Sequence, residues 1–185
     1  MMNHYNGHRE GHVSLQFDVE PMLFDISQRC FAGAEAAAPA GEATDAVPDP
    51  PSVTLMKDVL EGENLAIVKR MLERCMWETS NILYPFTDSA PQTIYHNNNP
   101  LDVKSYVVML HGIGNRTEAQ IQLLKSAVHD YVVLKATAEW QQISMPQGNQ
   151  WQITEQMAQT VREQVATALV MPRNIKRIKV RPHTY

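Results

Sequence analysis

The C-terminal segment of the chain concentrates side chains that can bind anions. The whole chain has 16 basic and 20 acidic residues and a formal net charge of −4. Residues 172–185 hold five of the basic residues and no acidic one, which leaves 11 basic against 20 acidic residues, a net charge of −9, for the rest. Such segregation is typical of a segment that meets phosphates or an acidic protein surface. The candidate interface residues are Arg173, Ile175, Lys176, Arg177, Ile178, Lys179, Val180 and Arg181.

Three roles are open for this basic tail, because apolar residues interleave with its charges. It could pair as a strand with the domain's own hairpin, line a nucleic-acid channel, or add a strand to the sheet of a neighbouring subunit. An arm that lines a DNA channel needs charge but gains nothing from buried isoleucines. We therefore expect residues 174–181 to dock extended against a protein surface, where an added strand uses both its backbone and its apolar face.

A second segment has the composition of a catalytic loop. Residues 106–116 end a β-like run in His-Gly-Ile-Gly, which resembles the oxyanion loop of α/β-hydrolases. That chemistry needs a nucleophile on a Gly-x-Ser-x-Gly elbow, and no two glycines of the chain bracket a serine in this way. We interpret Gly112 and Gly114 as structural residues that let a strand turn sharply into a helix, and we predict no catalytic residue.

The N-terminal histidines could suggest a metal site. His4, His8 and His12 lie four residues apart, which on a helix would place them on one face. Gly7 and Gly11 disfavour a helix there, so residues 1–13 are predicted to form a flexible arm without a metal. We expect no cofactor, since the sequence has no Gly-rich phosphate loop, CxxC pair or HExxH signature.

Helical periodicity dominates the remaining sequence. The segment around 22–38 becomes helical, with Leu23, Ile26, Cys30 and Phe31 on one face, and a strong helix is predicted over about 63–83, ended by Pro85. Both cysteines, Cys30 and Cys75, fall in these apolar patterns and are expected to be buried, reduced thiols.

Two long helices are predicted in the C-terminal half. Thr117 and Gln120 form a capping box that begins the first helix. Its apolar stripe is interrupted by Lys135 and comprises Ile121, Leu124, Val128, Tyr131 or Val132, Ala138 and Ile143. Pro146 and Gly148 mark a structural turn, and a second helix follows over about 150–171. Its stripe is Ile153, Met157, Val161, Val165 and Leu169.

These elements predict a mainly α fold, with a long antiparallel αα-hairpin, additional helices and a small β-hairpin or arm. The predicted organisation is one helical domain over 14–172, followed by the basic tail, 173–185. Within the domain we expect a linker at about 39–52, a β-arm at about 92–110 and the αα-hairpin at about 116–171. No apolar run approaches the roughly 18 residues of a membrane span, so no membrane partner is expected.

The C-terminal half resembles a known family. The segment HDYVVLKATAEWQQISMP, a polar helix with Trp151 near its start, and a short basic tail that ends in an aromatic are similar to the head–tail adaptor or neck ring proteins of tailed phages that infect Bacteroides-like bacteria, the crAss-like and related phages. The segments FDVEPMLFDIS and LYPF fit the same pattern.

This resemblance implies a structural virion protein without enzymatic activity. It implies a homo-oligomeric ring of about twelve copies in the phage neck, assembled in the host cytoplasm, which couples the portal protein to neighbouring neck or tail proteins. Non-specific contact with DNA in the lumen is then possible. Two alternatives are a small DNA-binding or regulatory protein that uses the basic tail and, least favoured, a degenerate α/β-hydrolase that uses His111.

Overall fold

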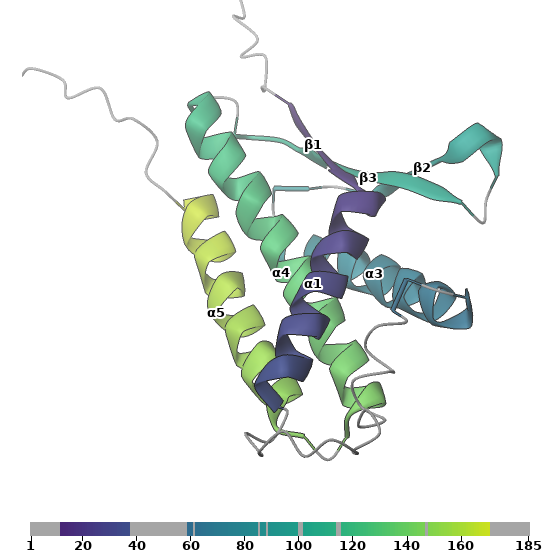
Figure 1. Ribbon diagram of the computed structural model, residues 1–185. Helices are drawn as coiled ribbons and strands as arrows, with labels where there is room; N and C mark the ends of the chain where they lie inside the picture. Colours follow the sequence, from purple (N-terminus) through teal and green to yellow (C-terminus); the bar gives the residue numbers. More distant parts are fainter. Residues whose placement is uncertain are drawn as a thin grey trace, which may run out of the picture.

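The computed structural model describes residues 12–37, 59–60, 62–84, 86–87, 89–99, 102–113, 116–146 and 148–170. Within these ranges the molecule is mainly helical, as predicted, with four α-helices and a small antiparallel sheet (Figure 1). The helices are α1 (Val19–Ala37), α3 (Gly62–Leu83), α4 (Glu118–Ser144) and α5 (Gln150–Val170). The predicted linker at 39–52 and the basic tail at 173–185 lie outside the described residues, as does most of the predicted N-terminal arm.

The sheet has three strands in the order β1-β3-β2, and lies at one end of the helices (Figure 1). β2 (Gln92–Tyr95) and β3 (Val103–Leu110) pair antiparallel, as the sequence predicted for the 92–110 segment. A short 3-10 turn, His96–Asn98, follows β2. The third strand, β1 (Val13–Asp18), pairs with the other edge of β3 and was not predicted to join the sheet.

The burial pattern of the strands explains why β1 joins β3. Leu15 lies opposite Val108 and Phe17 lies opposite Tyr106, and all four side chains are buried against the helices. A slip of one residue would turn these side chains to the outer face of the sheet, so their burial specifies the register. Val13, assigned to the flexible arm from the sequence, is the first residue of β1.

α4 is the central helix of the fold. It packs against α1, α3 and α5, and buried side chains surround its middle section. These residues are Tyr131, Val132, Val133, Leu134, Ala136, Thr137, Ala138, Trp140 and Gln141. The sequence predicted a single apolar stripe for this helix, which is too narrow a description. Ile143, placed on that stripe, is 62% exposed.

α5 returns along α4 after the short connection at 145–149 (Figure 1). Lys135 of α4 contacts Glu155 of α5, with 2.7 Å between Nζ and Oε1. The charge that interrupts the apolar stripe of α4 is therefore paired with a carboxylate of the neighbouring helix. Near the connection, the buried Thr154 hydroxyl donates to Oε1 of Gln141 at 2.8 Å. Both contacts cross between the two helices and fix their relative register.

The apolar residues of α1 and α5 are only partly placed as predicted. In α1, Ile26 and Cys30 are buried, whereas Phe31 is exposed. In α5, Val165 and Leu169 are buried, but Ile153 and Met157 are half exposed. The side of α5 that faces α4 is formed by Thr154, Ala158, Val165 and Ala168, because small side chains allow two helices to approach closely.

Candidate interaction surface

The outward face of α5 carries a continuous row of side chains that no described element covers. Ile153, Met157, Thr160, Gln164 and Thr167 follow one another at steps of four and three residues, which places them on one side of the helix. Ile153 is 50% exposed and Met157 is 49% exposed. We call this row the outer stripe of α5. Ile153 and Met157 lie one helical turn apart and together form an exposed apolar site on this face.

A groove lies beside the upper half of this stripe, between α4 and α5. It has a volume of about 440 Å³ and is lined by Leu123, Ala127, Thr160, Glu163, Gln164, Thr167 and Ala168. Leu123 is 53% exposed at its rim, and Ala168 is buried at its floor. Glu163 is the one charged side chain of the lining, and no basic group of the described residues forms an ion pair with it. The groove is therefore apolar with an acidic edge.

Arg116 fixes the C-terminal end of α5 against the start of α4. Its guanidinium donates hydrogen bonds to the backbone carbonyl oxygens of both Ala168 and Leu169. These carbonyls belong to the last turn of α5, where the helix offers them no N–H donor. The positive charge of Arg116 also interacts favourably with the negative end of the helix dipole. Burial lowers the pKa of Arg116 from its usual value. Arg116 thus sets where the chain leaves α5.

This role of Arg116 is not evident from the neighbouring sequence. The residue closes the HGIGNR segment and precedes the capping box, but its partners lie more than fifty residues further along the chain. A basic residue beside a helix N-terminus has no local reason to be there, because it opposes the helix dipole. That mismatch is the only signal in the sequence that Arg116 serves a different helix.

The His-Gly-Ile-Gly segment forms the connection between β3 and α4. Gly112 has φ of +69°, in the left-handed region that glycine tolerates, as the structural interpretation requires. The backbone N–H of His111 donates to the carbonyl of Phe86 at 2.9 Å, and Ile113 is buried. Gly114 lies outside the described residues. The predicted capping box is confirmed: Thr117 accepts from the N–H of Gln120, whose side chain accepts from the N–H of Thr117.

The fold around this segment differs from that of an α/β-hydrolase. The one sheet of the described residues has three antiparallel strands, whereas a nucleophile elbow stands on a parallel, doubly wound sheet. Of the other predicted turn residues, Pro146 and Gly148 lie in the connection between α4 and α5, where the N–H of Gly148 donates to the carbonyl of Met145 at 3.1 Å. None of these described turn residues is among those that line the groove.

The predicted interface residues of the tail, from Arg173 to Arg181, lie outside the described residues. Their attachment point is described: α5 ends at Val170, which is exposed, directly after the groove residues Thr167 and Ala168. The last described residue, Val170, therefore lies close to the groove, three residues before the first residue of the basic tail.

Several other ionisable groups form contacts between helices on the surface, and the two cysteines are buried. Arg29 of α1 lies 3.6 Å from Asp130 of α4, and His129 lies 3.6 Å from Asp25. Cys30 and Cys75 are free and buried, as predicted, and burial raises the pKa of Cys30 to about 12. In the described part of the chain, no group of three histidine, cysteine or acidic side chains could hold a metal ion.

Comparisons with models of protein families, with curated proteins and with solved structures gave no match for this chain. None of the described helices combines the length and apolar composition that a membrane span requires.

Proposed function

We propose that this chain is a non-catalytic subunit of a homo-oligomeric ring, the head–tail adaptor in the neck of a tailed phage. The observation that carries the proposal is the outer stripe of α5, with half-exposed Ile153 and Met157, and its adjoining groove, a surface that none of the described elements covers. The resemblance of residues 129–146 and of the segments around them to phage neck proteins supplies the assembly to which such a subunit would belong.

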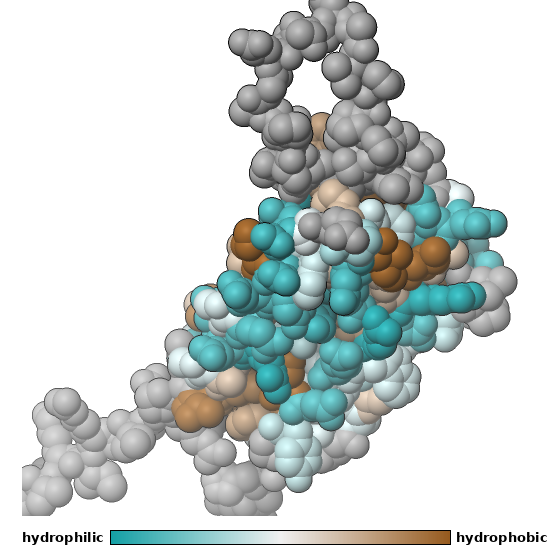
Figure 2. All heavy atoms as spheres, turned by 90° about the horizontal axis from the view of Figure 1, so that it is seen from below, coloured by the Kyte–Doolittle hydropathy of each residue, from teal (hydrophilic) through white to brown (hydrophobic). Residues whose placement is uncertain are grey.

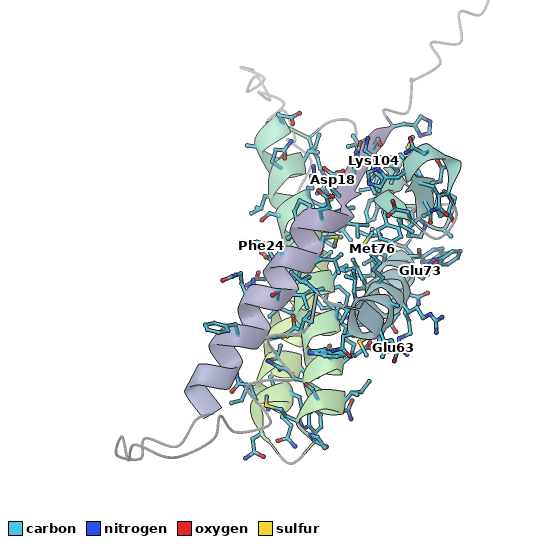
Figure 3. All side chains as sticks on the ribbon, turned by 45° about the vertical axis from the view of Figure 1, so that its right-hand side comes forward. Asp18, Phe24, Glu63, Glu73, Met76 and Lys104 are labelled. Atoms are coloured by element: carbon cyan, nitrogen blue, oxygen red, sulfur yellow. The ribbon has the colours of Figure 1, made fainter. Side chains whose placement is uncertain are left out.

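Exposed apolar side chains on other elements support a subunit with several neighbours. α1 exposes Phe24, on the side that faces away from the other helices (Figure 3). Trp77 in the C-terminal half of α3 and Tyr84 directly after α3 are also exposed. Figure 2, which views the molecule from below, shows apolar side chains at separate places on a largely polar surface. Aromatic residues are enriched in protein interfaces, and a ring subunit uses different patches for its two neighbours.

In this proposal, about twelve copies encircle the exit of the portal protein, within the virion. The outer stripe of α5 contacts an adjacent subunit or a neighbouring neck protein. The basic tail, residues 173–185, docks against an acidic protein surface, with the DNA of the lumen as its alternative partner. The acidic remainder of each subunit provides a complementary surface for such a tail.

The proposal is tested by measuring the mass of the protein in solution, alone and after coexpression with the products of the genes beside its own. A ring, or a stable complex with a portal or tail protein, is the expected result. A protein that stays monomeric and binds none of these products would contradict the proposal.

A further inference from the structure

We propose that, in the isolated subunit, residues 173–181 fold back and occupy the groove between α4 and α5 of the same chain. The groove is an apolar surface that the described residues leave open, with Leu123 half exposed at its rim. The proposal assigns it one occupant, the chain's own basic tail. It concerns the subunit before assembly, so it does not depend on the ring.

The position and length of the tail fit this occupant. Thr167 and Ala168 line the groove, and the chain leaves α5 only two residues later, at Val170. The lining of α5 runs from Thr160 to Ala168, roughly 12 Å at 1.5 Å per residue. Residues 174–181 in extended form span up to about 27 Å, which is enough to follow the groove and reach the lower part of the outer stripe.

The sequence at the start of the tail favours a reversal of direction. Residues 171–174 read Met-Pro-Arg-Asn. Proline is preferred at the second position of the common β-turns, because its fixed φ matches the turn. Proline also ends the helix. A turn here directs the following residues back along α5, and Arg116 holds the last turn of α5 in place as their starting point.

The side chains of the tail match those of the groove. Ile175, Ile178 and Val180 can cover Leu123 and the alanines, while the interleaved basic residues reach Glu163, which has no ion-pair partner among the described residues. The tail is attached beside its binding site, so its effective concentration there is high and modest contacts suffice to hold it.

The spacing of the apolar residues favours the groove over the sheet edge. β1 is an edge strand within the described part of the sheet, and could accept an added strand. Side chains of a strand alternate between its two faces, so Ile175 and Ile178, three residues apart, cannot both lie on the buried face. The groove has α4 on one side and α5 on the other, so side chains on both faces of an extended segment can contact it. The tail then covers part of the apolar surface of the free subunit.

Cysteine pairs in the full-length chain test this placement. Thr160→Cys is combined in turn with Ile175→Cys, Ile178→Cys or Val180→Cys, and the protein is oxidised mildly at low concentration. The native Cys30 and Cys75 are buried with raised pKa values and stay unreactive. We expect an intramolecular disulfide in at least one pair, seen as a monomer of faster mobility without reductant. The matched pairs that carry Ser14→Cys on β1 in place of Thr160→Cys should form none.

Trypsin cleavage gives an independent readout, since the tail contains five basic residues. Leu123→Gln should make cleavage within 173–181 about fivefold faster, because cleavage follows the population of the released tail. Ile143→Gln is the matched control, because Ile143 is an exposed apolar residue of α4 of similar size that does not line the groove. This substitution should leave the cleavage rate unchanged. Disulfides only between molecules, disulfides with the Ser14→Cys variants, or cleavage insensitive to Leu123→Gln would each overturn the proposal.

Discussion

Single residues decide how the two C-terminal helices begin and end. Arg116 is the clearest example, because its guanidinium donates hydrogen bonds to two backbone carbonyls of α5, a helix distant in sequence. A group that satisfies two otherwise unpaired acceptors contributes more than a typical surface contact, because its removal leaves both acceptors without a donor.

Replacement of Arg116 should therefore destabilise the fold. We expect Arg116→Ala to lower the free energy of unfolding by about 1–3 kcal/mol, the range for hydrogen bonds from charged groups. Arg116→Lys should recover only part of this, because an ammonium does not offer the planar pair of donors. Urea denaturation measures the effect, with Arg162→Ala as the control on the exposed side of α5. Equal stability of the Arg116→Ala and Arg162→Ala proteins would remove the proposed role of Arg116.

Gly112 is the second residue whose identity the fold requires. A Cβ at this position would have no atom within 4 Å, so the cost of substitution is backbone strain alone. At φ of +69°, Gly112→Val should destabilise the protein by about 1–3 kcal/mol, as expected for a β-branched residue in the left-handed region. Thermal denaturation reports it. His111→Ala should leave assembly intact. If instead His111→Ala abolished assembly while Gly112→Val had no effect on stability, the hydrolase alternative would have to be considered again.

At the scale of elements, the pairing of α4 with α5 combines small apolar contacts with one ion pair. Burial alone would raise the pKa of Glu155, but the hydrogen bonds from Lys135 and Gln159 outweigh it and lower the pKa. Burial lowers the pKa of Lys135, and the contact with Glu155 raises it by more. The pair therefore favours the charged forms of both groups in the folded protein.

This pair predicts an acid-dependent loss of stability. Because the folded-state pKa of Glu155 is depressed, its contribution is present above the usual glutamate value of about 4.3 and is lost as the pH falls through the lower folded pKa. Glu155→Gln should flatten the stability profile below about pH 4.3. Chemical denaturation from about pH 2.5 to about pH 7 compares the profile of this variant with that of the parent. A Glu155→Gln profile parallel to that of the parent would contradict the assignment.

The outer stripe of α5 carries a prediction about assembly. Ile153→Lys combined with Met157→Lys should leave the helical content unchanged, because both side chains are half exposed, but should weaken association through the cost of burying charge in an interface. Ala166→Lys adds a charge to an exposed position on another side of the same helix and is the matched control. Mass measurement after coexpression distinguishes them. Assembly by the double variant would place the interface elsewhere.

At the scale of the whole molecule, charge is divided between an acidic body and a basic tail. Crowding five positive charges is unfavourable unless something negative lies near them. In the free subunit we propose that these charges lie along the groove, near Glu163. In the proposed neck they contact the acidic surface of a neighbouring protein.

Deletion of residues 173–185 should thus leave a folded subunit that fails to enter the neck. Because the deletion removes the whole docking segment, phage particles should assemble without their phage tails, as electron microscopy would show. The described helices contain none of the deleted residues, so circular dichroism of the truncated subunit should show the same helical signal. Particles that assemble normally but leak or fail to eject DNA would assign the tail to the lumen instead.

The sequence by itself determined the features that depend on neighbours along the chain. The capping box at Thr117, the ends of α3 and α5 near prolines, the strands within 92–110 and the buried cysteines follow from local spacing. So does the mainly helical class of the fold.

Only the tertiary structure decided which faces are buried. Ile153 and Met157 fit the apolar spacing of α5, yet lie outward, because α4 accepts the face with Ala158 and Ala168. Periodicity shows that a helix has an apolar side but not how many sides find partners, which is why α4 is buried around its middle and α5 is not. The pairing of β1 with β3 and the contact of Arg116 with α5 join residues distant in sequence, and no local pattern encodes such partners.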